Sequence, residues 1–283
     1  MDSIEVRAHA KLNLTLDIIG KRDDGYHDLQ MVMQAVELHD TVRVVRRDCG
    51  IECSIDCAAL PSGEGNIAYK AARCFFDATG VDGGVSIAIE KRIPFAAGMA
   101  GGSADAAAVL HAMRRLFAPE LSDAALSELG AKVGSDVPFC LLGGTALAEG
   151  RGERLTSLPP MPRVPIVLCK PDFPLSTPEL FSLVRQGKIT RRPDTAAMLD
   201  ALARKDTDAV ASQLCNVFEE ILPEKYAEVH TIRAQMLALG AAGALMTGSG
   251  PTVFGIFKRE DAARRAMETL QEKYPQTFLT YPV

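Results

Sequence analysis

The sequence predicts an α+β fold in which a glycine-rich loop joins a strand to a helix. Strand-like and helix-like segments come in runs instead of strict alternation, which favours α+β. Residues 4–18 alternate apolar and polar side chains with a period of two, the pattern of a strand with one solvent-exposed face. Residues 94–108, PFAAGMAGGSADAAA, combine the glycine-rich loop with the start of an alanine-rich helix.

The composition is that of a globular protein with an apolar core. The chain has 283 residues, 47% hydrophobic residues and a net charge of −5, which suits one large domain or two of ordinary size. It has no dense Lys/Arg run and no apolar run of about 18 residues, so neither a nucleic-acid partner nor a membrane span is expected. The N-terminal residues lack a secretory signal, and we expect a cytoplasmic protein of undefined oligomeric state.

The elements after the first strand follow from periodicity, caps and glycines. We expect strands over 31–45 and 51–57, a helix from the N-cap Asn66 to Ala78 ended by Gly80, a strand over 85–89, helices over 103–117 and after Ser122, a loop at 134–138 and a strand over 139–149.

A proline-rich stretch at 157–165 is the best candidate for a linker. It divides the chain into expected domains of residues 1–158 and 164–283. In the second domain we expect strands at 166–169, 244–247 and 253–257 and helices from 176–180, over 194–214 and 224–239, and over 259–273.

The seven cysteines do not predict a metal site. Cys49, Cys53 and Cys57 are four residues apart, which matches no common zinc pattern. Because apolar and polar residues alternate over 51–57, we expect these thiols on the buried face of a strand.

The glycine-rich loop is of a kind that can hold a polyphosphate. Gly98, Gly101 and Gly102 permit positive φ angles and close approach, and the helix beginning near Ser103 adds amide donors and a partial positive charge. The loop matches neither G-x-x-x-x-G-K-[ST] nor G-x-G-x-x-G. A tight turn that only packs a helix against a sheet explains this stretch equally well.

Three further features fit phosphoryl transfer, which needs a phosphate cradle, a cation and a carboxylate that accepts a proton. Lys11 and Asn13 share one face of the first strand, Asp136 lies in the loop GSDVP, and MTGSGPT at 246–252 is a second glycine loop. Each has a structural alternative, because Lys11 could be an exposed strand lysine and Asp136 a turn former.

Four stretches resemble the galactokinase, homoserine kinase, mevalonate kinase and phosphomevalonate kinase (GHMP) superfamily. They are AHAKLNLTLDIIGKRDDGYHDLQ at 8–30, PFAAGMAGGSADAAA at 94–108, GSDVPFCLLGGTALAEGRGE at 134–153 and MTGSGPTVFGIF at 246–257. The resemblance implies an N-terminal domain like ribosomal protein S5 domain 2 and a ferredoxin-like C-terminal domain. It also implies ATP and Mg²⁺, and transfer of the γ-phosphoryl group to the C2 hydroxyl of a cytidine-diphosphate-linked methylerythritol in the non-mevalonate isoprenoid pathway.

The same resemblance implies roles for individual residues. Asp136 would be the general base, Lys11 would lie near the hydroxyl and the γ-phosphate, and Asn13 would orient the substrate. Residues implied near ATP are Pro94, Ala97, Gly98, Met99, Ala100, Gly101, Gly102, Ser103, Ala104 and Asn66. Residues implied near the second substrate are Tyr26, His27 and Phe181 around the cytosine, and Gly248, Ser249 and Gly250 at the other end.

Some of these residues have simpler interpretations. Asn66 could be only a helix cap, Phe181 a core residue, and His27 with Tyr26 a turn pair. Ala104 stands where many members of the superfamily have serine, which removes a possible contact to phosphate or Mg²⁺ and leaves the Mg²⁺ ligands open.

Two other functions stay open at this point. One is a GHMP kinase that acts on homoserine or mevalonate, which the DGYH motif disfavours. The other is a nucleotide-binding homologue without catalysis, which the presence of Lys11 and Asp136 disfavours.

Overall fold

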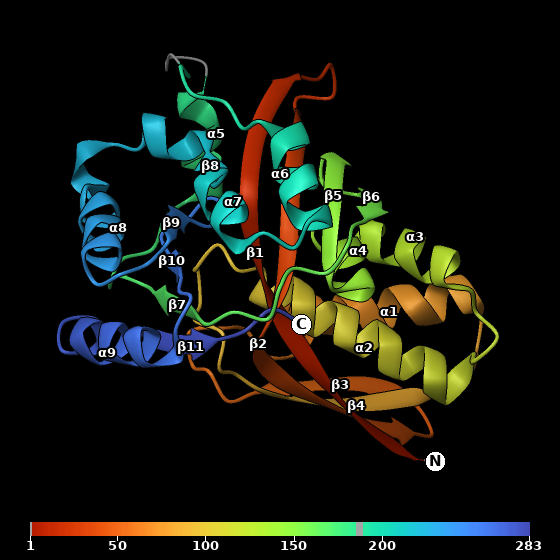
Figure 1. The fold of residues 1–283 in the computed structure, drawn as a ribbon. Helices are drawn as coiled ribbons and strands as arrows, with labels where there is room; N and C mark the ends of the chain where they lie inside the picture. The colour runs from red at the N-terminus through yellow and green to blue at the C-terminus, as the bar shows by residue number, and fades with distance from the viewer. Residues whose placement is uncertain (1, 185–188) are drawn as a thin grey trace. The chain divides into compact units, whose positions relative to one another are not determined.

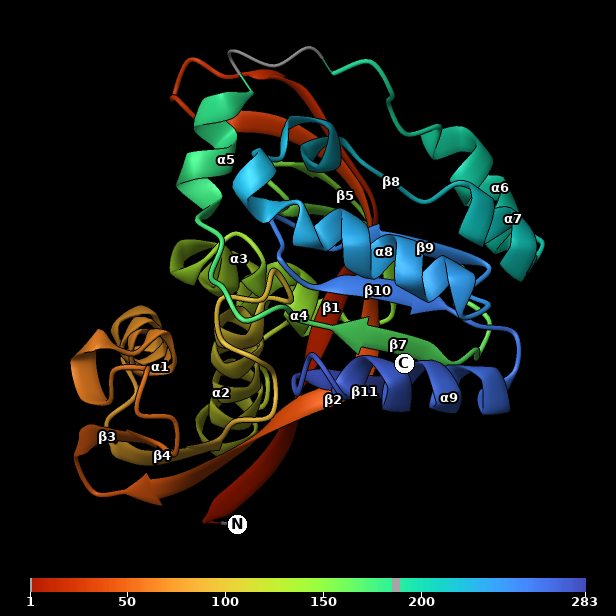
Figure 2. The same cartoon turned by 90° about the vertical axis from the view of Figure 1, so that its left-hand side faces the viewer.

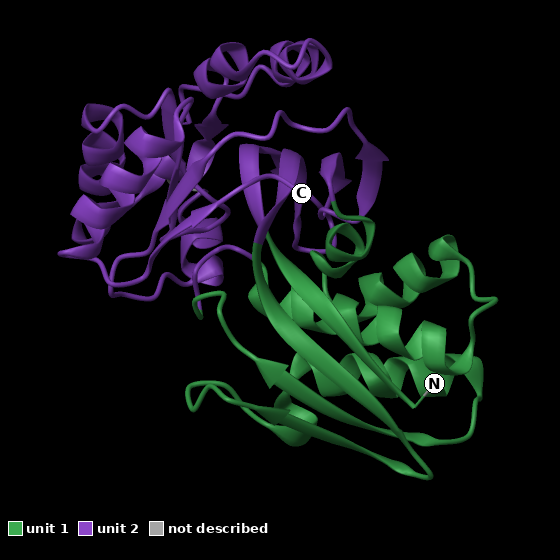
Figure 3. Cartoon of the chain, turned by 60° about the horizontal axis from the view of Figure 1, so that its bottom comes forward, with its two compact units in different colours: residues 1–10, 38–95, 100–143 green, residues 11–37, 96–99, 144–283 purple. Residues whose placement is uncertain are grey.

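The chain forms two compact units, which a computed structural model describes for residues 2–184 and 189–283. Unit 1 comprises residues 1–10, 38–95 and 100–143, and unit 2 comprises residues 11–37, 96–99 and 144–283 (Figure 3). Both units are therefore discontinuous in sequence. The division into domains 1–158 and 164–283 stays a prediction.

Unit 1 is a small sheet with four helices. Strand β3 (Gly50–Ile55) runs parallel to β4 (Gly84–Glu90), and β4 is antiparallel to the second half of β2 (His27–Arg47). Helix α1 (Ile67–Thr79) connects β3 to β4 and packs against α2 (Gly101–Phe117) (Figure 1). The other two helices are α3 (Asp123–Val133) and α4 (Val137–Leu142).

Helix ends in unit 1 follow from local side-chain chemistry. Asn66 Oδ1 accepts a hydrogen bond from the Ala68 N–H at 2.9 Å, and Gly80 ends α1 with a φ of 65°. Ser122 caps α3 by accepting from the Ala125 N–H at 3.2 Å. These three expectations are confirmed.

Unit 2 holds the first half of β2, the part of β1 (Ser3–Lys21) from Lys11 onwards, and two groups of strands. β5 (Thr145–Gly150) pairs with β2 and with β6 (Arg154–Ser157), while β8 (Cys215–Asn216) pairs with β1. A separate antiparallel sheet has the order β11-β7-β10-β9, with bounds Thr277–Thr280, Ile166–Cys169, Val253–Ile256 and Gly243–Met246.

Helices complete the α+β layers of unit 2. α8 (Glu228–Ala238) packs against β9 and β10, and α9 (Glu260–Gln271) packs against β7 and β11 (Figure 2). This is the ferredoxin-like arrangement expected for the C-terminal part. The remaining helical elements are α5 (Thr177–Leu183), α6 (Thr195–Ala203), α7 (Thr207–Ser212) and the 3₁₀ turns Gly63–Gly65, Val217–Ile221 and Glu224–Tyr226.

Two expected elements are wrong in type or extent. Residues 137–142 form α4, whereas a loop and a strand were expected there, because Pro138 suits a first helical turn and Gly143 and Gly144 end the helix with φ angles of 70° and 63°. The helix expected over 194–214 is broken. Lys205 has a φ of 54°, and Asp206 caps the new helix α7.

The polar face of β1 is exposed at Glu5 and Arg7, as expected, but it is buried from Lys11 to Asp17. Asn13 and Thr15 are fully buried, and Asp17 is 6% exposed. The cysteine expectation holds only for Cys53, since Cys49 is exposed and Cys57 lies beyond the end of β3 and is half-buried. No helix in the described part of the chain is long and apolar enough to cross a membrane.

Candidate active site

The start of α2 is an uncapped helix N-terminus. Its N-cap residue, Ala100, has left-handed backbone angles (φ 57°, ψ 30°) and no side chain caps the helix. Gly101 and Gly102 lie inside the first turn, so they do not supply the positive φ angles that were expected of them. Among residues 2–184 and 189–283, the first amide donors of α2 thus have no intrahelical or side-chain acceptor, as an anion-binding helix start requires.

Gly98 has the positive φ that was expected, and the group that closely approaches it is another backbone segment of the protein. With a φ of 73°, it lies so near the second glycine loop that a Cβ there would be 2.5 Å from the Thr247 carbonyl oxygen. The Lys11 N–H donates to the Met99 carbonyl at 3.1 Å. Ala97 and Met99 are buried, with exposed fractions of 3% and 1%. Pro94 is half-buried.

Ser103 and the loop before α4 approach each other in unit 1. A Cβ on Gly134 would be 3.8 Å from Ser103 Oγ and 3.6 Å from Ile67 Cδ1, and a Cβ on Gly102 would be 3.3 Å from Ile67 Cγ2. The buried methyl of Ala104 faces the interior, so a serine hydroxyl at this position would be buried. Unit 1 therefore brings the start of α2, the residue after Asn66 and the 134–136 loop to one place.

Asp136 is the N-cap residue of α4, and its carboxylate is unengaged. It is half-buried and makes no capping hydrogen bond, although its main-chain carbonyl accepts from the Cys140 N–H at 3.1 Å. Over residues 2–184 and 189–283, no side chain pairs with this carboxylate. A carboxylate in this state is able to accept a proton from a bound hydroxyl.

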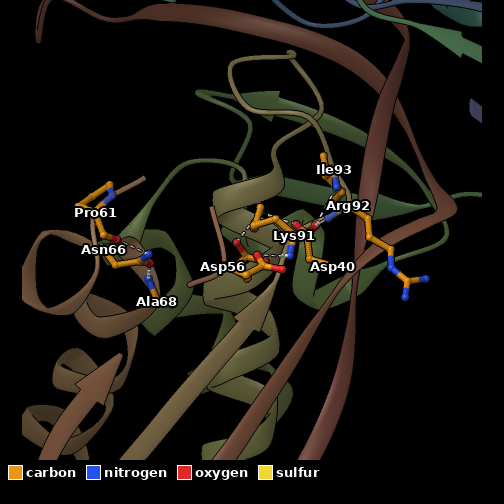
Figure 4. Close-up of polar contacts among 9 residues, drawn as sticks. Asp40, Asp56, Pro61, Asn66, Ala68, Lys91, Arg92 and Ile93 are labelled. Atoms are coloured by element: carbon orange, nitrogen blue, oxygen red, sulfur yellow. Dashed lines mark hydrogen bonds and ion pairs between the residues drawn. The ribbon is translucent and has the colours of Figure 1, made fainter. Parts of the chain in front are cut away.

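Asn66 is a helix cap, and its amide is engaged at both ends. Besides the bond from Ala68, Asn66 Nδ2 donates to the Pro61 carbonyl at 2.8 Å (Figure 4). The simpler interpretation of Asn66 is thus supported, while its implied contact with ATP stays a prediction.

A buried charge cluster beneath α2 was not predicted from the sequence. Lys91 Nζ contacts Asp40 Oδ2 at 2.5 Å and Asp105 Oδ2 at 2.7 Å, and Asp40 Oδ1 also accepts from the Arg92 and Ile93 N–H groups (Figure 4). Burial is the main cause that raises the pKa of Asp105 to about 7, and the negative charge of Asp40 adds to it against the opposing effect of Lys91.

This cluster packs against Gly101, at the end of the glycine-rich loop. A Cβ on Gly101 would be 3.4 Å from Lys91 Nζ and 3.1 Å from Ile93 Cγ2. Asp105 Oδ1 is buried and has no hydrogen-bond partner in the part of the chain that the structure describes. The signal in the sequence was the pair of Lys91, just before the loop, and Asp105, in the first turns of the helix.

Lys11 is a buried ammonium group held by a neutral partner. It is 5% exposed, and its Nζ donates to Asn13 Oδ1 at 2.6 Å, which confirms that the two side chains share one face of β1. No carboxylate in the described part of the chain forms an ion pair with Lys11. Since burying an unpaired charge is costly, this arrangement is suited to an anionic ligand.

The second glycine loop closes around Lys11 in unit 2. Gly248 has a φ of 56°, and a Cβ there would be 3.1 Å from Lys11 Nζ. Asn13 N–H donates to Thr247 Oγ1 at 2.9 Å, and Ser249 Oγ lies 2.6 Å from Thr177 Oγ1. Lys11, Asn13, Gly248 and the backbone of Gly98 are therefore brought together.

Asn216 is a positioning residue that sequence reasoning missed. Its Nδ2 donates to the carbonyls of Met246 and Gly248, each at 2.8 Å, and the side chain is buried. It is the second residue of the two-residue strand β8, which carries no periodic signal. Only the contact across 30 residues reveals its role.

The aromatic residues lie at one end of β2 and on α5. The rings of His27 and Phe181 stack with centroids 5.0 Å apart and planes at 23°, so they contact each other and leave no room for a base between them. Phe181 also packs edge-on against Phe218. Tyr26 is 55% exposed, and a cavity of about 290 Å³ beside His27 is lined also by Ile18, Ile19, Gly20, Lys21, Val184, Ile189 and Arg192.

Two protein-family matches cover more than half of the chain. Residues 66–144 match the GHMP kinases N terminal domain, and residues 198–276 match the GHMP kinases C terminal family. A protein of Acetivibrio thermocellus named 4-diphosphocytidyl-2-C-methyl-D-erythritol kinase is 46% identical over 283 residues, with 100% of both chains covered. The chain belongs to this family of GHMP kinases.

Other members of this kinase family agree with the assignment. The protein of the same name from Clostridium botulinum strain Langeland is 43% identical over 276 residues, covering 97% of this chain and 98% of its own. A crystal structure of 4-(cytidine 5'-diphospho)-2C-methyl-D-erythritol kinase superposes with a TM-score of 0.85 at 37% identity, covering 99% of both chains.

A more distant structure shows the shared fold alone. The homoserine kinase from Cytophaga hutchinsonii has a TM-score of 0.77 at 18% identity, covering 100% of this chain and 95% of its own. The fold expected from the GHMP resemblance is thus confirmed. Lys11 and Asp136 belong to different units, and their joint action stays a prediction.

Proposed function

We propose that this chain transfers the γ-phosphoryl group of ATP to the C2 hydroxyl of 4-diphosphocytidyl-2-C-methyl-D-erythritol. The observation that carries the proposal is the match over the full length to kinases of that name at 46% and 43% identity. The reaction is a step of the non-mevalonate route to isoprenoid precursors. Homoserine and mevalonate kinases share the fold at less than 20% identity, so they give no support for those substrates.

The triphosphate would be held by the uncapped start of α2. Its free amide donors and the hydroxyl of Ser103 would face phosphate oxygens, and Gly102 is exposed there. Pro94, Ala97, Gly98 and Met99 would contribute through their backbone, with Ala100, Gly101 and Ala104 next to them. Asn66 would lie beside the nucleotide, because its neighbour Ile67 contacts the first turn of α2.

Catalysis would depend on one carboxylate, Asp136, and one ammonium group, Lys11. Asp136 would accept the proton of the C2 hydroxyl as the hydroxyl oxygen attacks the γ-phosphorus. Lys11 would stabilise the charge that develops on the attacking and transferred oxygens, and Asn13 would fix the ammonium by their 2.6 Å hydrogen bond. Gly248 and Ser249 would close over this end of the substrate.

Mg²⁺ is proposed to accompany ATP. Among the described residues no group of three or more His, Cys, Asp or Glu could hold a metal ion, and this fits an ion carried mainly by phosphate oxygens. When bound, it would neutralise charge on the polyphosphate. Ser103, in the first turn of α2, would offer a hydroxyl to the ion or to these oxygens.

The cytidine moiety would be bound by Tyr26, His27 and Phe181. Because His27 and Phe181 contact each other, the base would either stack on the exposed ring of Tyr26 or separate the other two rings.

A substrate panel tests the proposal. Purified protein with ATP and Mg²⁺ is expected to release ADP with the cytidyl substrate and not with mevalonate or homoserine. If mevalonate were phosphorylated and the cytidyl compound ignored, the proposed acceptor would be wrong. Tight ATP binding without transfer to any acceptor would instead favour a non-catalytic nucleotide-binding role.

A further inference from the structure

An arginine at the tip of the β5–β6 turn lies over the exposed ring of Tyr26. Arg151 Cζ is 5.0 Å from the centroid of the Tyr26 ring. In this turn Gly150 and Gly152 have φ angles of 71° and 109°, and the Arg151 N–H donates to Glu153 Oε2 at 2.6 Å. β5 pairs with β2 so that Gly150 is opposite Leu29, which fixes the turn beside Tyr26.

The guanidinium of Arg151 has no carboxylate partner in the described part of the chain. Nearby Arg22, in contrast, is paired with Asp24 at 3.1 Å and with Asp28 at 2.8 Å. The carboxylate of Glu153 is engaged by the backbone of the turn. Arg151 is half-buried, and its charge is only one of the weaker causes that lower the pKa of Asp24. An unneutralised cation therefore stands directly beside the ring that is proposed to meet the base.

We propose that Arg151 is a further substrate-binding residue, whose guanidinium contacts the diphosphate of a cytidine diphosphate group. This rests on the proposed function, in which Tyr26 meets the cytosine. In a nucleoside diphosphate the anionic group lies one ribose away from the base, so a cation beside the base-binding ring is placed to reach it. The guanidinium group can donate two parallel hydrogen bonds to phosphate oxygens, and its cation–π contact with Tyr26 holds it beside that ring.

Binding measurements with three ligands separate this role from simple support of the ring. Calorimetry would compare cytidine, CMP and CDP for the wild type, Arg151→Ala and Arg151→Lys. Arg154→Ala is the matched control, since Arg154 is an exposed arginine of the same hairpin. We expect Arg151→Ala to weaken CDP binding by about 10- to 100-fold, the range for hydrogen bonds to charged groups, and to change cytidine binding by less than about twofold.

The lysine variant and the steady-state constants give further readouts. Arg151→Lys should recover part of the CDP affinity, because it keeps the charge and loses the fork. In the kinase assay, Arg151→Ala should raise the KM for the cytidyl substrate and leave the KM for ATP unchanged. Arg154→Ala should match the wild type throughout.

Two results would overturn the assignment. If Arg151→Ala weakened cytidine and CDP equally, Arg151 would only support Tyr26, and if it weakened neither, Arg151 would not face the substrate. A wild type that bound none of the three cytidine ligands would refute the proposed function itself. That failure would appear without any substitution, so the two failures are distinguishable.

Discussion

Replacing Gly248 by alanine tests the packing around Lys11. The residue has a φ of 56°, in the left-handed region where a side chain costs roughly 1–2 kcal/mol. The new Cβ would also be 2.8 Å from the Gly98 carbonyl oxygen and 3.1 Å from Lys11 Nζ. The carbonyl belongs to backbone and cannot retreat easily, whereas the ammonium can move, so the loop and Lys11 must both shift.

The expected loss of stability is the sum of the backbone cost and the overpacking cost. Overpacking of this kind adds about 1–3 kcal/mol, so Gly248→Ala should lower the free energy of unfolding by roughly 2–5 kcal/mol in total. Displacing Lys11 from Asn13 should also reduce kcat by about 100-fold, the effect of a misplacement near 1 Å.

Gly80→Ala is the matched control for this experiment. Gly80 also has a left-handed backbone, with a φ of 65°, but nothing lies within 4 Å of its Cβ position. It should therefore cost only the backbone term and leave kcat unchanged. Denaturant unfolding and steady-state kinetics measure both quantities. The reasoning is refuted if Gly248→Ala is no less stable than Gly80→Ala and keeps wild-type kcat.

Three other substitutions probe the separate parts of the site. Asp136→Asn should lower kcat by about 100- to 10,000-fold with ATP binding unchanged, and near-normal turnover would disprove its role as base. Asn216→Ala should destabilise the protein by about 2–3 kcal/mol in urea unfolding, because the buried carbonyls of Met246 and Gly248 lose their 2.8 Å donor; a loss below 0.5 kcal/mol would contradict this. Burial raises the pKa of Asp105 from its ordinary value of 3.8 to about 7 in the folded protein. Between pH 3.8 and pH 7 the unfolded chain has therefore released this proton while the folded protein still holds it. The free energy of unfolding should fall as pH rises through this range, by about 1 kcal/mol per pH unit. Asp105→Asn should flatten this slope in melting curves from pH 4 to 7, and an unchanged slope would assign it to another group.

The strongest sequence patterns gave the right elements because their causes are local. The alternation in 4–18, the Asn66 cap and the Gly80 stop each depend on a few neighbouring residues, and all three are found. The failures had non-local causes. β1 is buried on both faces from Ala10 to Ile18, and no period-two pattern reveals that a polar row is covered.

In the candidate site too, contacts between near neighbours in sequence could be predicted and contacts between distant segments could not. Lys11 and Asn13 could be paired from spacing alone, since residues two apart on a strand share a face. The Asp40–Lys91–Asp105 cluster joins three separate segments, and the contacts of Asn216 join β8 to the 246–248 loop. Such contacts depend on topology, which the sequence specified only through resemblance to a known family.

The identity of the phosphorylated product tests the central claim most directly. Purified protein would be incubated with ATP, Mg²⁺ and the cytidyl methylerythritol, and the product examined by ³¹P and ¹³C NMR spectroscopy. We predict one new phosphomonoester, with phosphorus coupled to the tertiary C2 carbon, in an amount equal to the ADP released. A phosphate on another hydroxyl, or ADP release without any phosphorylated polyol, would contradict the account.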